Sequence, residues 1–386
     1  MILGIDASKA NKENKTGVEW YAYFLIEEYK KIFHQGEKVI LYSQEPLRGE
    51  LGKLPPGWQS KVLKWPSFRF CLWTQIRLSL EMLFHPPDVL FIPAHVFPLI
   101  HPKKTVMMVH DIAAYRTPES FSQFERLYSL WSAKYAVKNL WRVIVPTVFT
   151  KSEILEFLQK GKKLDPEKIG SFAEKMHVVY HGYAPEFHPY EQTEQTRSIL
   201  KKYTISKPYI ISIGRLEEKK NTASIIDAYG LFRERNPDMS LQLVLVGNPG
   251  YGYKKVEEAL QRSNYREDII LAGWVPQDDL PCLLSFAEIF LFPSVYEGFG
   301  IPVLESFAAG TPVLASNIPA LCEVGGEAAT YIEFKDQEEI ARTIEAILKI
   351  DTLKEEKRMR GLERVKNFSW KNCAERTFQI LEEKTN

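Results

Sequence analysis

Two glutamates separated by seven residues lie where a strand, a glycine-rich loop and a helix start follow one another. Glu297 comes after the apolar run Ile289–Phe292 and beside Gly298 and Gly300, and Glu305 lies about one turn inside the helix that we expect next. Helix starts expose unpaired N–H groups at a positive dipole end, and glycines let a ligand approach the backbone. The stretch predicts a site for an anion or a polyol.

A pair of basic residues follows a second apolar run. Tyr209–Ile213 is an expected strand, and Gly214 separates it from Arg215 and Lys220, after which a helix begins at Thr222. Arginine offers a planar fork and lysine a point charge, so both can converge on one pyrophosphate. Each charge-assisted contact can contribute ~1.5–3 kcal/mol. The alternative is a solvated loop of mixed charge.

The first half of the chain offers weaker candidates. Thr16 can cap a helix that begins at Gly17, and Gly17 lets a ligand approach closely, although an ordinary cap explains the pair equally well. His110 and Asp111 follow the apolar run Thr105–Val109, where parallel-sheet proteins place ligand contacts, so His110 can donate to a sugar hydroxyl. A structural histidine is the alternative. The Gly-x-Gly-x-x-Gly fingerprint of dinucleotide binding is absent from the sequence.

The elements that would position these residues alternate in two series. Nearly continuous apolar strands alternate with helical patterns before and after a polar segment at 186–196, which predicts an α/β protein with two doubly wound, Rossmann-like parallel sheets in series. We expect a domain over 1–188, a second over 189–368, and a final helix within 369–386. Expected strands are Ile2–Ile5, Lys38–Tyr42, Val89–Ile92, Thr105–Val109, Arg142–Val145 and His177–Tyr180, then Tyr209–Ile213, Leu241–Val246, Ile269–Leu271, Ile289–Phe292, Pro312–Leu314 and Thr330–Ile332.

Composition is typical of a globular protein, at 386 residues with 45% apolar and 26% charged. There is no run of 18 apolar residues, no signal-peptide pattern, and the four cysteines lack paired spacing, so we expect a cytoplasmic chain without a zinc site. Residues 51–150 hold twelve Lys and Arg against five Asp and Glu, with many aromatics. Such a stretch suits nucleic acid, an anionic membrane surface or a phosphorylated ligand, or else simply buried aromatics and solvated lysines.

The run from Pro293 to Glu305, Pro-Ser-Val-Tyr-Glu-Gly-Phe-Gly-Ile-Pro-Val-Leu-Glu, resembles the signature of retaining nucleotide-sugar glycosyltransferases of family four, also called glycosyl transferases group 1. The spacing Gly-Arg-Leu-x-x-x-Lys in that family selects Lys220 and not Lys219. The resemblance extends from Ile211 to about Lys349 and is weaker before it. It implies a GT-B fold, with two Rossmann-like domains facing a cleft and the last helix returning to the first domain.

The resemblance also implies roles for residues at matched positions. Arg215 and Lys220 would hold the diphosphate, Glu305 the ribose, and Glu297 would lie near the donor sugar. The N–H groups of Gly298, Phe299 and Gly300 would bind sugar hydroxyls. His110 would contact the donor sugar from across the cleft, and Gly17 would lie near the phosphates or the acceptor. The turns that contain Gly247 and Val275–Pro276 would pass beside the nucleotide, the second along the base.

The resulting expectation is a retaining hexosyltransferase of polysaccharide biosynthesis. It would move mannose, by resemblance to bacterial polysaccharide mannosyltransferases, from GDP-mannose or a UDP-sugar to a glycan or lipid-linked acceptor. The sequence has no Asp-x-Asp, so we expect no metal and no cofactor besides the donor. We also expect no nucleic-acid partner, and contact with the inner face of an anionic membrane is open. Alternatives are glucosyl, rhamnosyl or galactosyl transfer, a sugar-nucleotide epimerase, glycan phosphorolysis and a non-catalytic binder.

Overall fold

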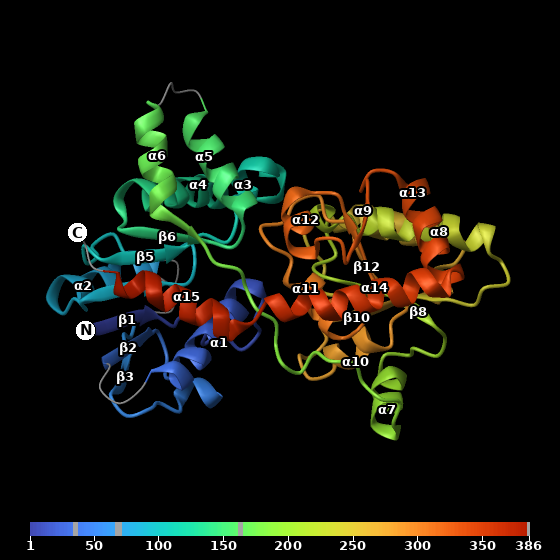
Figure 1. Ribbon diagram of the computed structural model, residues 1–386, viewed down its shortest axis with the longest axis horizontal. Helices are drawn as coiled ribbons and strands as arrows, with labels where there is room; N and C mark the ends of the chain where they lie inside the picture. Colours follow the sequence, from blue (N-terminus) through green and yellow to red (C-terminus); the bar gives the residue numbers. More distant parts are fainter. Residues whose placement is uncertain (34–37, 66–71, 161–164, 384–386) are drawn as a thin grey trace. The chain divides into compact units, whose positions relative to one another are not determined.

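The structure is a computed structural model that describes residues 1–33, 38–65, 72–160 and 165–383. The chain divides into two units (Figure 1). The amino-terminal unit comprises Met1–Arg116, Phe121–Gly182 and Ser369–Asn386, and the carboxyl-terminal unit comprises Thr117–Ser120 and Tyr183–Phe368. The amino-terminal unit therefore contains both ends of the sequence.

The amino-terminal unit is built on a seven-stranded parallel sheet in the order β3-β2-β1-β4-β5-β6-β7. Its central strands are buried along their length, as expected for a sheet covered on both faces. The chain runs outward from β1 to β3 and then returns to β4 on the other side, so the strand order reverses between β1 and β4. The strands are β1 (Ile2–Asp6), β2 (Lys38–Ser43), β3 (Trp58–Val62), β4 (Val89–Ile92), β5 (Thr105–Met108), β6 (Arg142–Val145) and β7 (Met176–Val178).

Helices pack on this sheet from segments far apart in the sequence. The last helix, α15, lies against α1, with Trp370 stacked on Phe24 at 5.4 Å between ring centroids (Figure 1). A group formed by α4, α5 and α6 packs together near β6. The helices are α1 (Gly17–Ile32), α2 (Ser79–Phe84), α3 (Ala113–Arg116), α4 (Gln123–Asn139), α5 (Val148–Gln159), α6 (Pro166–Lys175) and α15 (Trp370–Glu382), and the π-helical segment η3 (Trp73–Leu78) precedes α2.

The carboxyl-terminal unit has a six-stranded parallel sheet in the order β10-β9-β8-β11-β12-β13. Here the order reverses between β8 and β11, and ligands of such sheets bind beside the carboxyl ends of strands at this point. The strands are β8 (Tyr209–Ile213), β9 (Gln242–Val246), β10 (Ile269–Gly273), β11 (Ile289–Phe292), β12 (Val313–Ser316) and β13 (Thr330–Ile332).

The helices of this unit cover both faces of its sheet. α8 packs against α9 and α13, and α11 packs against α10, α12 and α14 (Figure 1). A core cluster under α8 contains Ile225, Tyr229 and Phe232, all fully buried. The helices are α7 (Glu194–Lys202), α8 (Thr222–Arg235), α9 (Tyr253–Arg262), α10 (Leu280–Ser285), α11 (Ile301–Ala308), α12 (Pro319–Gly325), α13 (Gln337–Lys349) and α14 (Asp351–Arg364).

The structure confirms the predicted fold class of two Rossmann-like parallel-sheet domains. β3 was missed because its sequence, Trp-Gln-Ser-Lys-Val, has polar residues at its centre and no continuous apolar run. It lies at the edge of its sheet, where one side needs no partner strand. None of the described helices combines the length and apolar character that a membrane crossing requires. Cys282, Cys322 and Cys373 are free thiols, and Cys71 lies outside the described residues.

Candidate functional site

The loops after β8 and β11 meet at the point where the strand order reverses. Lys220, on the β8 loop, forms an ion pair with Oε1 of Glu297, on the β11 loop. The Lys220 ammonium also lies over the ring of Phe292, the last residue of β11, at 4.7 Å from its centroid. The backbone N–H of Val295 donates to the carbonyl of Lys219 at 2.9 Å and joins the same two loops. Residues 77 positions apart are thereby held together.

Arg215 and Lys220 differ in how exposed their side chains are and in which carboxylate lies beside them. Arg215 is 67% exposed, and its nearest carboxylate, Glu217, is 4.0 Å away. Lys220 is only 19% exposed, and its stem passes over Gly214, where an added Cβ would lie 3.3 Å from the lysine Cε. Gly214 therefore makes room for the Lys220 side chain, whereas most of the Arg215 side chain faces solvent.

The loop after β9 lies between the loops that follow β8 and β10. Gly247 has a φ of +137°, and a Cβ there would approach the Gly214 carbonyl oxygen to 2.0 Å. Its N–H donates to the Gly273 carbonyl at 2.8 Å, directly before the turn in which Val275 is buried and Pro276 is exposed. The structure thus brings the predicted turns together at the carboxyl ends of β8, β9 and β10.

The segment from Gly298 to Gly300 is buried, with Phe299 only 4% exposed and its ring 6.2 Å from that of Phe368. Gly300 is the N-cap of α11 at a φ of +102°, and a Cβ there would lie 2.6 Å from Leu321. This packing fixes the start of α11 beside Glu297. The predicted contacts of these N–H groups with sugar hydroxyls stay a prediction.

Glu305 lies in the second turn of α11 and is half-buried. Burial raises its pKa to about 8, and within the described part of the chain no cation pairs with its carboxyl group. At neutral pH the group is therefore mostly protonated, and it can donate one hydrogen bond and accept others. That combination suits a diol.

His110 and Gly17 lie in the amino-terminal unit. His110 is buried, and its Nε2–H donates to the Pro93 carbonyl at 2.9 Å because a carbonyl can only accept. Burial, with His95 nearby, lowers its pKa to about 3, so the ring is neutral. A hydroxyl would therefore meet His110 as an acceptor at Nδ1, and not as the donor that the sequence suggested. Gly17 is exposed at the start of α1, behind the N-cap Thr16.

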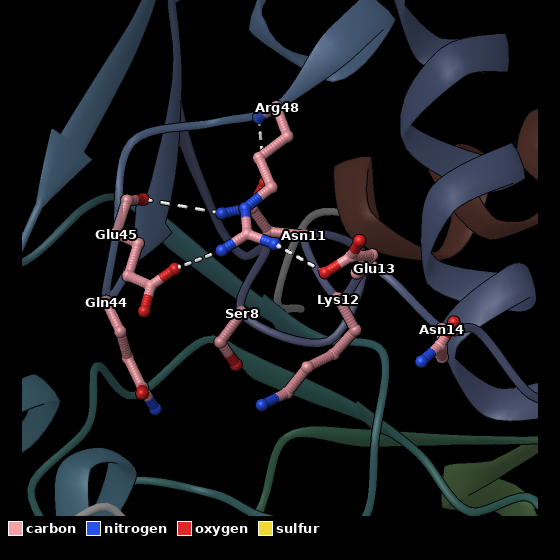
Figure 2. A pocket seen from close by; sticks show the side chains of 8 residues that line it. All are labelled: Ser8, Asn11, Lys12, Glu13, Asn14, Gln44, Glu45 and Arg48. Carbon is pink, nitrogen blue, oxygen red and sulfur yellow. Dashed lines mark hydrogen bonds and ion pairs between the residues drawn. The ribbon is translucent and has the colours of Figure 1, made fainter. Parts of the chain in front are cut away.

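A polar pocket of about 370 Å³ lies in the amino-terminal unit between the loops that follow β1 and β2 (Figure 2). Asn11 joins the loops, since its Oδ1 accepts from the Arg48 N–H at 2.9 Å and its Nδ2 donates to the Pro46 carbonyl at 3.0 Å. Sequence reasoning missed this pocket, because its residues follow two strands that are adjacent only in the folded sheet. It is lined by Ser8, Asn11, Lys12, Glu13, Asn14, Gln44, Glu45 and Arg48.

Comparisons with known proteins agree with this arrangement. Residues 195–364 match the family model of glycosyl transferases group 1. The O-antigen chain mannosyltransferase B of Escherichia coli is 28% identical over 299 residues, which is 77% of this chain and 73% of that protein.

Two solved structures share the fold over nearly the whole chain. WaaG, a glycosyltransferase involved in lipopolysaccharide biosynthesis, matches with a TM-score of 0.73 and 17% identity over 100% of both chains. Anabaena HepE in complex with UDP-glucose matches with a TM-score of 0.71 and 17% identity over 98% of both chains. Residues 195–364 therefore belong to the glycosyl transferases group 1 family, and the chain as a whole has the two-domain GT-B fold.

Proposed function

We propose that this protein transfers a hexose from a nucleotide diphosphate sugar to a glycan or lipid-linked acceptor in polysaccharide biosynthesis, with retention of the anomeric configuration. The observation that carries the proposal is the Lys220–Glu297 pair at the strand-order reversal of the carboxyl-terminal unit, with Arg215 on the same loop. The Lys220 cation matches the diphosphate of such a donor, and the neighbouring Glu297 carboxylate matches the hydroxyl groups of its sugar.

Mannose is the favoured donor sugar, because the similar O-antigen protein of Escherichia coli is a mannosyltransferase. Glucose is the second candidate, because the similar HepE structure contains UDP-glucose. The two proteins are only 28% and 17% identical to this chain, so the proposal includes transfer of mannose, glucose, rhamnose or galactose.

The ion pair suggests how the donor is received. A diphosphate that reaches Lys220 replaces Glu297 as its partner, and the released Glu297 carboxylate can accept hydrogen bonds from sugar hydroxyls. Arg215, which is 67% exposed on the same loop, would bind the same diphosphate. Negative charge that develops on the departing phosphate oxygen is then stabilised by two cations and by the amino end of α11, without a required metal ion.

The remaining site residues complete the proposal. Protonated Glu305 would donate to one ribose hydroxyl and accept from the other, and neutral His110 would accept from a donor-sugar hydroxyl at Nδ1. The acceptor hydroxyl enters on the face that the phosphate leaves, and the phosphate oxygen takes its proton. Exclusion of water from the occupied site would prevent hydrolysis of the donor.

We assign the acceptor to the pocket of the amino-terminal unit (Figure 2). Its lining mixes amide, hydroxyl, carboxylate, ammonium and guanidinium groups, which donate to and accept from sugar hydroxyls, and none of the eight described lining residues is aromatic or aliphatic. Gln44→Ala should raise the acceptor KM several-fold while the donor KM stays unchanged, as initial rates at varied concentrations of each substrate would show. Equal acceptor KM values in variant and wild type would remove this assignment.

A thermal-shift screen of UDP-, GDP-, ADP- and dTDP-sugars tests the donor site. A ligand present at 100 times its Kd stabilises the folded state by ~2.7 kcal/mol, so one class should raise the unfolding midpoint clearly above the others. Incubation of that donor without acceptor separates the alternatives, because an epimerase would change the sugar and a transferase would leave it intact. No shift with any sugar nucleotide would contradict the proposal.

A further inference from the structure

Apolar side chains of the amino-terminal unit face solvent along the continuous helical segment formed by η3 and α2. Leu72, Ile76, Leu80 and Leu83 recur at spacings of four, four and three residues and are all exposed, and Phe84 beside them is 69% exposed. The opposite side of the same segment fills the core with Trp73, Leu78 and Met82. The core therefore accounts for only one of the two apolar faces.

Helix α4 shows the same feature. Phe124, Leu127 and Trp131 follow the i, i+3, i+7 spacing of one helical face and are 73%, 69% and 42% exposed. The face that packs inward carries the small residues Ala133 and Ala136. A helix that needed only to cover the sheet would place polar residues on this outer face.

Two hydrogen bonds hold these segments beside one another. Gln75 of η3 donates to the Tyr128 hydroxyl of α4 at 2.7 Å. The N–H of Ile100 donates to Ser79 Oγ at 3.3 Å, so the exposed pair Leu99 and Ile100 lies next to α2. We call the exposed side chains of these three segments the apolar surface; it comprises Leu72, Ile76, Leu80, Leu83, Phe84, Leu99, Ile100, Phe124, Leu127 and Trp131.

Positive charge accompanies the apolar surface. Lys103, Arg126 and Lys134 lie on the same segments or directly after them, and none of them forms an ion pair with a described residue. The carboxylates of these elements are already engaged. Glu81 is buried and paired with Lys61 and Arg77, and Glu125 accepts from Ser122 at the start of α4.

We propose that the apolar surface binds an anionic lipid bilayer, with its leucine and aromatic side chains inserted at the headgroup level and Lys103, Arg126 and Lys134 against lipid phosphates. Large exposed apolar patches mark interaction sites, and apolar side chains flanked by cations match an anionic bilayer, which offers both kinds of contact. A symmetric contact between two copies would bring these cations against the same cations of the partner, since such an interface pairs one patch with itself. Nucleic acid would leave the leucines without a counterpart.

The inference goes beyond the proposed reaction and does not depend on it. Vesicle binding is measured without any sugar nucleotide, so a failure of transfer activity and a failure of membrane binding are separate results. Membrane binding and the proposed transfer reaction are compatible, because a lipid-linked acceptor would be presented at the bilayer surface.

Co-sedimentation with vesicles tests the proposal. The wild-type protein should pellet with phosphatidylglycerol–phosphatidylcholine vesicles at low salt, and much less with pure phosphatidylcholine or at high salt. Phe124→Ser with Leu127→Ser should lower the partition coefficient by tenfold or more, because the variant lacks two of the apolar side chains that insert into the bilayer. Lys103→Gln and Arg126→Gln should each lower it about fivefold, which corresponds to the attraction of one cation near an anionic surface.

A matched control replaces exposed apolar residues of the other unit, Ile350→Ser with Met359→Ser, and should leave the partition coefficient unchanged. Unchanged unfolding midpoints would show that all variants are folded. Three results would overturn the proposal: no pelleting of the wild type at low salt, equal pelleting of the Phe124→Ser/Leu127→Ser variant and the wild type, or a dimer in solution that this variant dissociates.

Discussion

At the scale of single residues, the positions of Lys220 and Arg215 predict how substitution of either residue would change the rate of transfer. We predict that Arg215→Ala and Lys220→Ala each lower kcat by ~10²-fold or more, since each removes one cation that stabilises the developing charge on the leaving phosphate. Steady-state rates with the donor found in the thermal-shift screen would measure this loss.

The neighbouring variant Lys219→Ala is the control for that prediction. Lys219 carries the same charge on the same loop, yet the ion pair to Glu297 is made by Lys220. We expect Lys219→Ala to keep most of the activity. If all three variants turn over at nearly the wild-type rate, the cationic leaving-group role is wrong.

The raised pKa of Glu305 predicts a pH-dependent stability. The pKa is about 8 in the folded protein against an ordinary 4.5, so between these values the folded state holds the proton more tightly than the unfolded state. The contribution of Glu305 to stability is then fully present below about pH 4.5 and falls as pH rises toward 8, by at most about 1.4 kcal/mol per pH unit. In Glu305→Gln this decline should be absent, which urea unfolding at pH 5, 6.5 and 8 would check. Parallel curves for variant and wild type would argue against it.

At the scale of elements, glycines set how closely the loops of the carboxyl-terminal unit approach. We predict that Gly247→Ala destabilises the protein by at least ~1–3 kcal/mol, because the residue has a positive φ and its Cβ would collide with the Gly214 carbonyl. The matched variant Gly230→Ala, inside α8 with nothing within 4 Å of the new Cβ, should instead stabilise it by ~0.5–1 kcal/mol. Denaturant unfolding would measure both, and a harmless Gly247→Ala would show that the loops can separate.

Most elements were predictable from the sequence, because a strand buried on both faces must be apolar throughout. β4, β6, β8, β11 and β13 have the bounds that we expected from the sequence. The exception is β3, whose pairing with β2 and not its composition makes it a strand. The helix α7 begins at Glu194 within the segment expected to be a linker, because Thr193 caps it through the Thr196 N–H at 3.2 Å.

At the scale of the whole molecule, the last helix belongs to the unit in which the chain begins. Trp370 is 4% exposed and stacks on Phe24, and a Cβ on Gly182 would touch its backbone. We predict that Trp370→Ala costs about 3–5 kcal/mol of the amino-terminal unit's stability and leaves donor binding by the carboxyl-terminal unit intact.

Unfolding monitored together with nucleotide-sugar binding would separate the two effects of Trp370→Ala. Lys371→Ala, whose side chain is 68% exposed on the same helix, should stay within ~0.5 kcal/mol of the wild type. Loss of donor affinity in Trp370→Ala, at temperatures where it is folded, would contradict the prediction.

The sequence by itself determined the two sheets and the residues that follow their strands, because periodicity, glycines and charged side chains are local properties of the chain. Only the tertiary structure decided which of these residues meet. Lys220 reaches Glu297 because β8 and β11 are neighbours, Glu305 holds its proton because α11 is packed, and the Nε2–H of His110 is occupied by the Pro93 carbonyl. The same holds for the polar pocket and the apolar surface, since which face of a helix the core covers depends on its neighbours in space.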